Sequence, residues 1–177
     1  MSQLHMRRAD LNNLPPLELP DGYTLREYSA GDEKGIAALL QETFAEPWSS
    51  ERALEVLIRP DDVKKTFVIE SGGEIVATAS ARLLPEAYPG AGYVHYVAAS
   101  PHHAGKKLGY LVSLATLHEF VQMNCQSAVL DTDDFRLPAV KTYLNLGFTP
   151  HHSDDSHSQR WAAVDAILAA REKPQGA

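Results

Sequence analysis

The hydrophobic pattern of this chain changes its period once, near Gly109, and that change restricts the fold more than any other feature. Residues 64–84 form two β-rich runs around SGGE, whose glycines permit the positive φ angles of a tight turn, and residues 92–100 form a third run. From Gly109 to about Asn124 apolar residues recur at helical spacing, and a short apolar run follows over 127–132. The pattern predicts an antiparallel meander that leads into a β-α-β crossover.

The flanking segments extend this pattern into a mixed α/β fold with one sheet. We expect a strand over 23–28 and four further helices, over 32–46, 50–58, 136–148 and 158–172. Asp32 and the serine that opens 50–58 are candidate N-terminal caps, and Gly147 is suited to ending the third of these helices. Trp161 recurs at helical spacing with other apolar residues, which indicates a core position.

The domain organisation is read from proline content and length. The segment 11–23 contains three prolines, which predicts an extended arm in place of a helix or strand. A chain of 177 residues is typical of one domain. We therefore expect an N-terminal arm over 1–22, a single domain over 23–172 and a polar tail over 173–177.

Charge and cysteine content limit the classes of partner. The chain has 16 Lys and Arg against 23 Asp and Glu, a net charge of −7, which argues against nucleic acid or an anionic membrane and favours cationic substrates. The single cysteine, Cys125, excludes an intramolecular disulfide and fits a reducing compartment and a packing role. No apolar run is long enough to span a membrane, and the N-terminus lacks the apolar core of a signal peptide. We expect a cytoplasmic protein.

The stretch SPHHAGKKLGYLV, residues 100–112, is the candidate phosphate site. Unpaired N–H groups and the dipole at a helix start favour an anion, and Gly105 and Gly109 permit close approach of backbone and ligand. Lys106 and Lys107 add positive charge, which costs helix stability unless an anion compensates it. A tight turn into a helix without any ligand remains the alternative for these residues taken alone.

The wider arrangement resembles the GCN5-related N-acetyltransferase (GNAT) superfamily. The family has a strand that leads into a pyrophosphate loop and a helix, and this arrangement is similar to YVHYVAASPHHAGKKLGYLV in this chain. A further strand follows in both. The family's A-x-x-x-Tyr-x-x-x-Gly-Phe pattern is then matched within PAVKTYLNLGF by Ala139, Tyr143, Gly147 and Phe148. The resemblance covers roughly residues 23–150. It implies an acyl-CoA N-acyltransferase fold, an antiparallel meander followed by a β-α-β-α half, with acetyl-CoA as co-substrate. The proline-rich arm and DDFRLPA are more loosely similar to mycothiol-synthase-like members.

The pyrophosphate loop departs from the family pattern. Ala104 stands where Arg or Gln is usual, Lys107 replaces the middle glycine, Ala99 replaces a valine and Arg136 an asparagine. The resemblance then implies that backbone N–H groups hold the pyrophosphate with charge from the lysines, over Ala104, Gly105, Lys106, Lys107, Leu108 and Gly109. The helix that includes SHSQRW stands where the family's last strand is expected.

The resemblance also assigns catalytic roles. Tyr143 matches the family's general acid, and a phenol that is protonated at neutral pH suits that role. Alternate side chains of the strand 92–99 would face the acyl site, so His95 is the candidate base, on one face with Tyr93 and Val97, and Tyr93 is its substitute or helper. The backbone N–H groups of Val97, Ala98 and Ala99 would polarise the thioester carbonyl. A core tyrosine and a structural histidine are the alternatives for Tyr143 and His95.

Two polar clusters remain. Asp131, Asp133 and Asp134 follow a strand end, where they can bind a cationic amine or relay a proton, or form a solvated turn and a helix cap. HHSDDSH (151–157) matches no standard zinc spacing, so we expect no metal and a polar loop with Ser156 or Ser158 as a helix cap.

Together these features predict an N-acetyltransferase. It would move an acetyl group from acetyl-CoA to the primary amine of a small molecule by direct transfer in a ternary complex. The first alternative is a non-catalytic acyl-CoA sensor on the same fold, which the altered loop favours. A flavin or nucleotide binder is disfavoured because no strand–GxGxxG–helix unit opens the chain. The oligomeric state stays open, a homodimer included.

Overall fold

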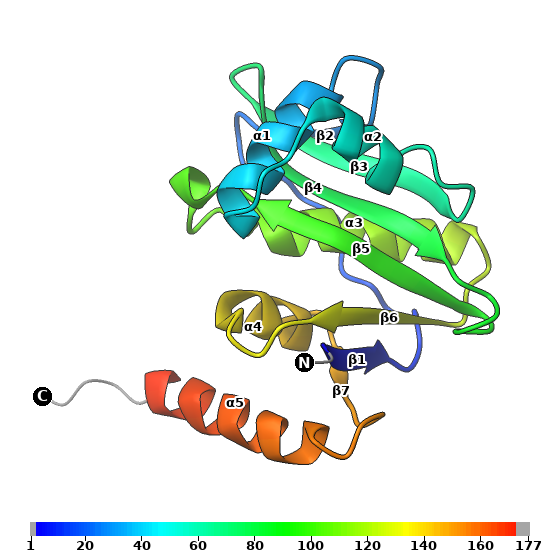
Figure 1. The fold of residues 1–177 in the computed structure, drawn as a ribbon, viewed down its shortest axis with the longest axis vertical. Coiled ribbons are helices and arrows are strands. Elements are labelled where there is room, and N and C mark those ends of the chain that lie inside the picture. Colours follow the sequence, from blue (N-terminus) through cyan, green and yellow to red (C-terminus); the bar gives the residue numbers. More distant parts are fainter. Residues whose placement is uncertain (1–2, 173–177) are drawn as a thin grey trace, which may run out of the picture.

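One seven-stranded sheet organises the computed structural model, which describes residues 3–172 (Figure 1). The strand order is β2-β3-β4-β5-β6-β1-β7. The strands are β1 (Leu4–Arg8), β2 (Thr24–Glu27), β3 (Val63–Ser71), β4 (Glu74–Leu83), β5 (Ala91–Ala99), β6 (Ser127–Thr132) and β7 (Thr149–His151). The helices are α1 (Glu33–Phe44), α2 (Ser50–Leu57), α3 (Leu108–Gln122), α4 (Leu137–Asn145) and α5 (His157–Glu172), with a 3₁₀ turn over Pro101–His103.

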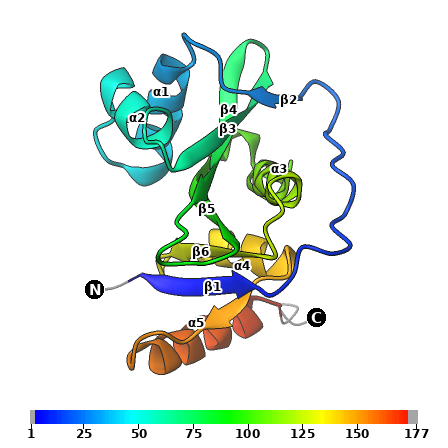
Figure 2. The same ribbon diagram turned by 90° about the vertical axis from the view of Figure 1, so that its right-hand side faces the viewer.

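Two helical layers cover the meander half of the sheet. Figure 2 shows α1 and α2 on one face and α3 on the other. The first layer buries a cluster that includes Ile36, Leu40 and Val68, and the second buries one that includes Leu111 and Val112. The mixed α/β fold, the hairpin and the β-α-β crossover are confirmed, and Gly72 and Gly73 take the positive φ angles expected at the hairpin turn. Within residues 3–172, no helix is long and apolar enough to cross a membrane.

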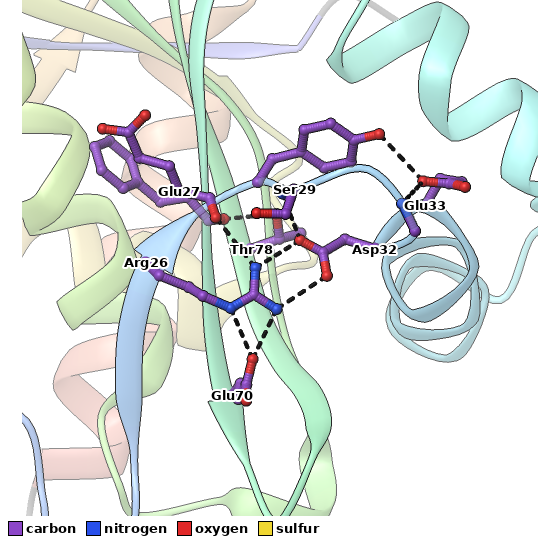
Figure 3. Close-up of polar contacts among 10 residues, drawn as sticks. Arg26, Glu27, Ser29, Asp32, Glu33, Glu70 and Thr78 are labelled. Atoms are coloured by element: carbon purple, nitrogen blue, oxygen red, sulfur yellow. Dashed lines mark hydrogen bonds and ion pairs between the residues drawn. The ribbon is translucent and has the colours of Figure 1, made fainter.

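A polar cluster fixes the start of α1 to the sheet, as Figure 3 shows. Arg26 of β2 donates to both carboxylate oxygens of Asp32, at 2.6 and 2.9 Å, and to Glu70 of β3 at 2.8 Å. Asp32 is the N-cap residue of α1, as predicted, but its side chain does not bond to a helix N–H, because this bidentate pair and the Ser29 N–H occupy the carboxylate. The guanidinium also lowers the pKa of Asp32. The prediction that Ser50 caps α2 is wrong by one residue, because Ser50 is the first helical residue and the capping side chain is Ser49, which accepts from the Arg52 N–H.

The N-terminal residues hold the largest difference from the sequence-based expectation. The expected arm over 1–22 includes β1, which lies inside the sheet between β6 and β7 (Figure 1). Leu4 and Met6 are completely buried in the main core. The helix expected at 158–172 is present as α5. The sequence pattern did not indicate the short strand β7 or the pairing of β1 with β6 and β7. The expected tail 173–177 lies outside the described residues.

A β-bulge and a divergence of strands shape the centre of the sheet. Thr78 pairs with Ala98 and Ser80 with His95, so Tyr96 and Val97 of β5 together oppose one residue of β4, and Tyr96 takes a φ of +47°. The parallel pairing of β5 with β6 involves only Ala91–Tyr93. Beyond that point the two strands diverge (Figure 1).

Candidate active site

A cleft of about 680 Å³ borders the part of β5 that has lost its pairing with β6. α1 forms one wall, and the end of β6 with α4 forms the other. Its lining combines aromatic and ionisable side chains with the backbone of β5 and the start of α3. Among the lining residues are Phe44, Tyr93, His95, Tyr96, Val97, Ala99, Gly109, Asp131, Asp133, Arg136 and Tyr143.

The candidate phosphate loop lies where α3 begins. Leu111 donates its N–H to the carbonyl of Lys107, which leaves the N–H groups of Leu108, Gly109 and Tyr110 without acceptors in the helix. Ala104, Gly105, Lys106 and Lys107 are exposed, whereas the Leu108 side chain is buried under the sheet. Gly105 has a φ of +83°, and a Cβ added there would meet no atom within 4 Å. An open loop, free N–H groups and two lysines fit the pyrophosphate of a CoA thioester.

Lys107 takes the conformation that a glycine would take most easily. It is the N-terminal cap of α3 and has φ +56° and ψ +29°, in the left-handed region. This is the position at which the sequence departs from the family's middle glycine. The loop thus has a left-handed backbone at this position and a charged residue where a glycine would be least strained.

The backbone of β5 divides its N–H groups between β4 and the cleft. Ser100 donates to Val76 of β4 at 2.8 Å, and hydrogen-bonding direction alternates along a strand. Outside the bulge this alternation turns the N–H of Ala98 toward β4 and that of Ala99 away from it, and Val97 and Ala99 both line the cleft. Ala98 is also buried beneath α1 and α2. Of the three residues whose amides were predicted to polarise the carbonyl, Val97 and Ala99 therefore border the cleft and Ala98 does not.

Tyr143 of α4 enters the cleft from a buried position. The side chain is 6% exposed and packs at 6.1 Å from the ring of Phe148. Burial raises the pKa of its hydroxyl, so Tyr143 keeps its proton at neutral pH. It can therefore donate a proton within the cleft.

His95 of β5 also lines the cleft and lies beneath α2. Its ring bonds to the backbone carbonyl of Val56, and burial lowers its pKa to about 4, with the nearby Arg82 adding to the effect. His95 is neutral at pH 7, and Nε2 is buried without a hydrogen-bond partner among residues 3–172. A neutral imidazole with a free nitrogen can accept a proton.

The bulge at Tyr96 changes which residues share a face with His95. Tyr93 and His95 do lie together, with ring centroids 5.9 Å apart. The prediction that Val97 shares this face is wrong, because the extra residue turns Val97 toward the α3 side, where it packs with the cluster of Leu111 and Val112. Tyr96 joins His95 instead, at 4.7 Å between ring centroids.

Tyr93 is bound to a carboxylate. Its hydroxyl donates to Oδ2 of Asp131 at 3.0 Å, and its ring stacks on Tyr88 at 5.9 Å. Burial and the Asp131 charge raise the pKa of Tyr93, so its phenol is protonated at neutral pH. Of the two candidate bases, His95 is the one in a state that can accept a proton directly.

The three clustered aspartates have different surroundings. Asp131 and Asp133 line the cleft, and Asp133 pairs with Arg136 at 2.9 Å. Asp134 pairs with Arg160 of α5 at 2.9 Å, which lowers its pKa, and it is outside the cleft lining. The structure thus places two of the three where a substrate can meet them.

The histidine-rich segment 151–157 does not gather its side chains. His157 is completely buried, whereas His151, His152 and Asp154 are exposed. Within the described part of the chain, no three His, Cys, Asp or Glu side chains are grouped to hold a metal ion. Asp154, which accepts from Ser156, lies at the start of α5. Trp161, as predicted, is in the core, and Cys125 is half-buried and packs against the same core cluster.

Several cleft residues were not identified from the sequence. Phe44 faces Arg136 across the cleft, with the guanidinium 4.5 Å from the ring centroid, and Tyr96 enters through the bulge. Gln3, just before β1, also lines the cleft. Helical spacing places Phe44 on the inner side of α1, which was the one available signal. The bulge and the docking of the N-terminus leave no periodic signal.

The comparisons with known proteins agree with this geometry. Residues 34–148 match the family model described as the Acetyltransferase (GNAT) family. Mycothiol acetyltransferases from Nocardioides sp. and Thermobispora bispora are each 32% identical, over 87% and 81% of this chain and 59% and 52% of their own lengths. This chain thus spans little more than half the length of these relatives. A GCN5-related N-acetyltransferase structure from Sphaerobacter thermophilus shares the fold, with a TM-score of 0.65 and 20% identity over 86% of this chain and 50% of that one.

Proposed function

The chain belongs to the acetyltransferase (GNAT) family, and on this premise we propose that it transfers an acetyl group from acetyl-CoA to the amine of a small molecule. One observation carries the proposal. A single cleft brings together the start of α3, the neutral His95 and the protonated Tyr143. Direct transfer needs these three elements: a place for the CoA phosphates, a proton acceptor and a proton donor.

In the proposed reaction acetyl-CoA supplies the acetyl carbonyl and the leaving sulfur. The amine nitrogen forms the new bond to the carbonyl carbon while the bond from that carbon to sulfur breaks. His95 takes the proton that the amine loses, and Tyr143 protonates the leaving sulfur. The N–H groups of Val97 and Ala99 hold the carbonyl oxygen as negative charge develops on it. Cys125 takes no part, because no acyl-enzyme forms.

The charge of the cleft supports a cationic acceptor. Glu46, Asp131 and Asp133 line it, and its one arginine, Arg136, is already paired with Asp133. The aromatic faces of Phe44, Tyr93 and Tyr96 add surfaces that attract an ammonium group. The named relatives make the acceptor of mycothiol acetyltransferases a second candidate to include in any screen. The cytoplasmic location expected from the sequence is part of the same proposal.

Calorimetry with acetyl-CoA at moderate salt tests the phosphate loop first. The variant Lys106→Ala, Lys107→Gly removes both charges but keeps the left-handed backbone that residue 107 requires. We expect it to weaken binding by about tenfold, with a flatter salt dependence, because two charge contacts are lost. Lys64→Ala, which removes an exposed lysine from β3, is the matched control and should bind like the wild type. Equal binding by both variants would contradict the assignment of the loop.

Release of the free CoA thiol with a panel of amines then tests catalysis. Tyr143→Phe should bind acetyl-CoA normally and lower kcat by about 100-fold, the range expected when a general acid is removed. Binding without turnover of any amine would favour the acyl-CoA sensor. An unchanged kcat in Tyr143→Phe would remove Tyr143 from the mechanism.

A further inference from the structure

A histidine of the N-terminal strand lies directly behind one wall of the cleft. The antiparallel register of β1 with β6 sets His5 opposite Asp131. Nδ1 of His5 lies against Oδ1 of Asp131, a contact that is an ion pair when the imidazole is protonated, and both side chains are partly shielded from solvent, at 27% and 18% exposed. Asp131 lines the cleft, whereas His5 does not.

Asp131 is thereby held from two sides. Tyr93 of β5 donates to Oδ2, and His5 of β1 contacts Oδ1. The three side chains form a row across three neighbouring strands of the sheet. Oδ1 has no hydrogen-bond donor among the described residues, so the His5 ring confines the carboxylate by contact while Tyr93 holds Oδ2, and together they restrict its rotation.

The position of His5 is fixed by the packing of β1. Leu4 and Met6, its neighbours on either side, are completely buried on the other face of the strand. A shift of β1 by one residue would expose both and bury His5, so the register is strongly specified. The ring of His5 also packs at 5.4 Å from the ring of the buried His157 of α5.

We propose that His5 is a positioning residue that fixes Asp131 as the anchor for a protonated, non-reacting amino group of the acceptor. This inference rests on the proposed function and narrows its substrate class to compounds with two amino groups. Of the cleft carboxylates, Asp133 is paired with Arg136 and Glu46 with Arg52, whereas the ion-pair contact of Asp131 is with a histidine, so we assign the cation to Asp131. The stacked rings of Tyr88 and Tyr93 lie beside it and favour an ammonium group there.

The test compares 1,4-diaminobutane with butylamine, which lacks the second amino group. His5→Leu removes the contact to Asp131, His5→Asn keeps a donor close to the position of Nδ1, and His152→Asn is the matched control at an exposed histidine outside the cleft lining. We expect His5→Leu to raise the KM for 1,4-diaminobutane about tenfold and to change kcat, and the KM for butylamine, by less than about twofold. His5→Asn should restore most of the loss, and His152→Asn should match the wild type.

Direct calorimetric binding of 1,4-diaminobutane to the CoA-saturated protein separates the two proposals. Binding that weakens in Asp131→Asn and His5→Leu, without any acetyl transfer, would support the anchor and contradict the proposed function. A wild type that acetylates butylamine and 1,4-diaminobutane with equal efficiency would overturn the proposal that Asp131 anchors a second amino group, and would leave the proposed acetyltransferase function intact. An unchanged diamine KM in His5→Leu, or an equal loss for both amines, would also overturn it, as would a wild type that neither binds nor acetylates the diamine.

Discussion

In the half of the sheet from β2 to β5, each strand pairs with the next one along the chain, and in the half formed by β6, β1 and β7 the partners come from opposite ends of it. Leu4 faces Thr132 and His5 faces both Asp131 and His151, whereas Ser71 faces Glu74 across a two-residue turn. Local pairing leaves periodic and turn signals in the sequence. Long-range pairing leaves only a buried apolar pattern with no indication of its partner.

The largest effect should come from core truncations in the two halves. Leu4→Ala in β1 should lower the free energy of unfolding by about 3 kcal/mol, because Leu4 is completely buried in the main core. Leu25→Ala in the edge strand β2, where Leu25 is half-buried, should cost about 1 kcal/mol. Urea unfolding measures both. Equal losses would mean that β1 contributes no more to stability than an edge strand.

The pH dependence of stability tests the buried state of His95, which lies on β5 beside the cleft. The pKa of His95 is lowered by burial to about 4, so the unfolded chain takes up the proton first. Stability from this residue is complete above about pH 6.5 and falls as the pH drops toward 4, by up to about 3 kcal/mol.

Urea unfolding at pH 7 and pH 4.5 provides the measurement for His95. The loss between these values should be roughly 2 kcal/mol smaller in His95→Gln than in the wild type. His152→Gln, at an exposed site, should lose as much as the wild type. A His95→Gln variant with the wild-type slope would mean that His95 is protonated in the folded protein.

Gly92 lies at the junction of the two halves, between Leu83 of β4 and Ala128 of β6. A Cβ here would lie 2.2 Å from the ring of Phe120 in α3. Gly92→Ala should therefore destabilise the protein by about 2 kcal/mol through overpacking. Phe120→Leu in the same background should recover part of this loss, as thermal unfolding would show. A Gly92→Ala variant as stable as the wild type would mean that the junction can open without cost.

The smallest effect is expected at the start of the crossover helix. Lys107→Gly should stabilise the protein by about 1 kcal/mol or less, because it relieves a left-handed backbone at a residue with a side chain. Lys106→Gly, at a neighbouring position without a positive φ, should destabilise slightly and is the matched control. A loss of stability in Lys107→Gly would mean that the lysine side chain contributes contacts that outweigh the strain.

The sequence predicted the fold where local signals operate. The hairpin, the long helix after the glycine–lysine loop and Gly147 at the end of α4 all follow from period and turn chemistry. The role of β1 could not be predicted, because His5 and Met6 pair with strands whose position depends on the rest of the fold. Asp32 shows a second limit, since it takes the predicted N-cap position but its carboxylate pairs with Arg26 and not with a helix N–H.

The candidate site was predictable in its components and not in its arrangement. Tyr143, His95 and Asp131 were identified from motif position and strand ends, and the cleft does bring them together. The bulge at Tyr96 turns the side chain of Val97 to the other face of the sheet, because one extra residue shifts the two-residue alternation of side chains along the strand. The residue composition of the strand gives no sign of this shift. Gln3 and Arg136 reach the cleft through tertiary packing alone.

The place of β1 between β6 and β7 also has a consequence for the order in which the protein can assemble. During synthesis β1 is made before both of its neighbours in the sheet, which begin only at Ser127 and Thr149. β1 therefore stays unpaired, with the core side chains Leu4 and Met6, until β6 and β7 have been made. Late closure of so distant a pairing predicts slow folding, and a waiting strand can enter the same gap in a second molecule. The segment that completes the sheet is thus also the one most open to exchange between nascent chains.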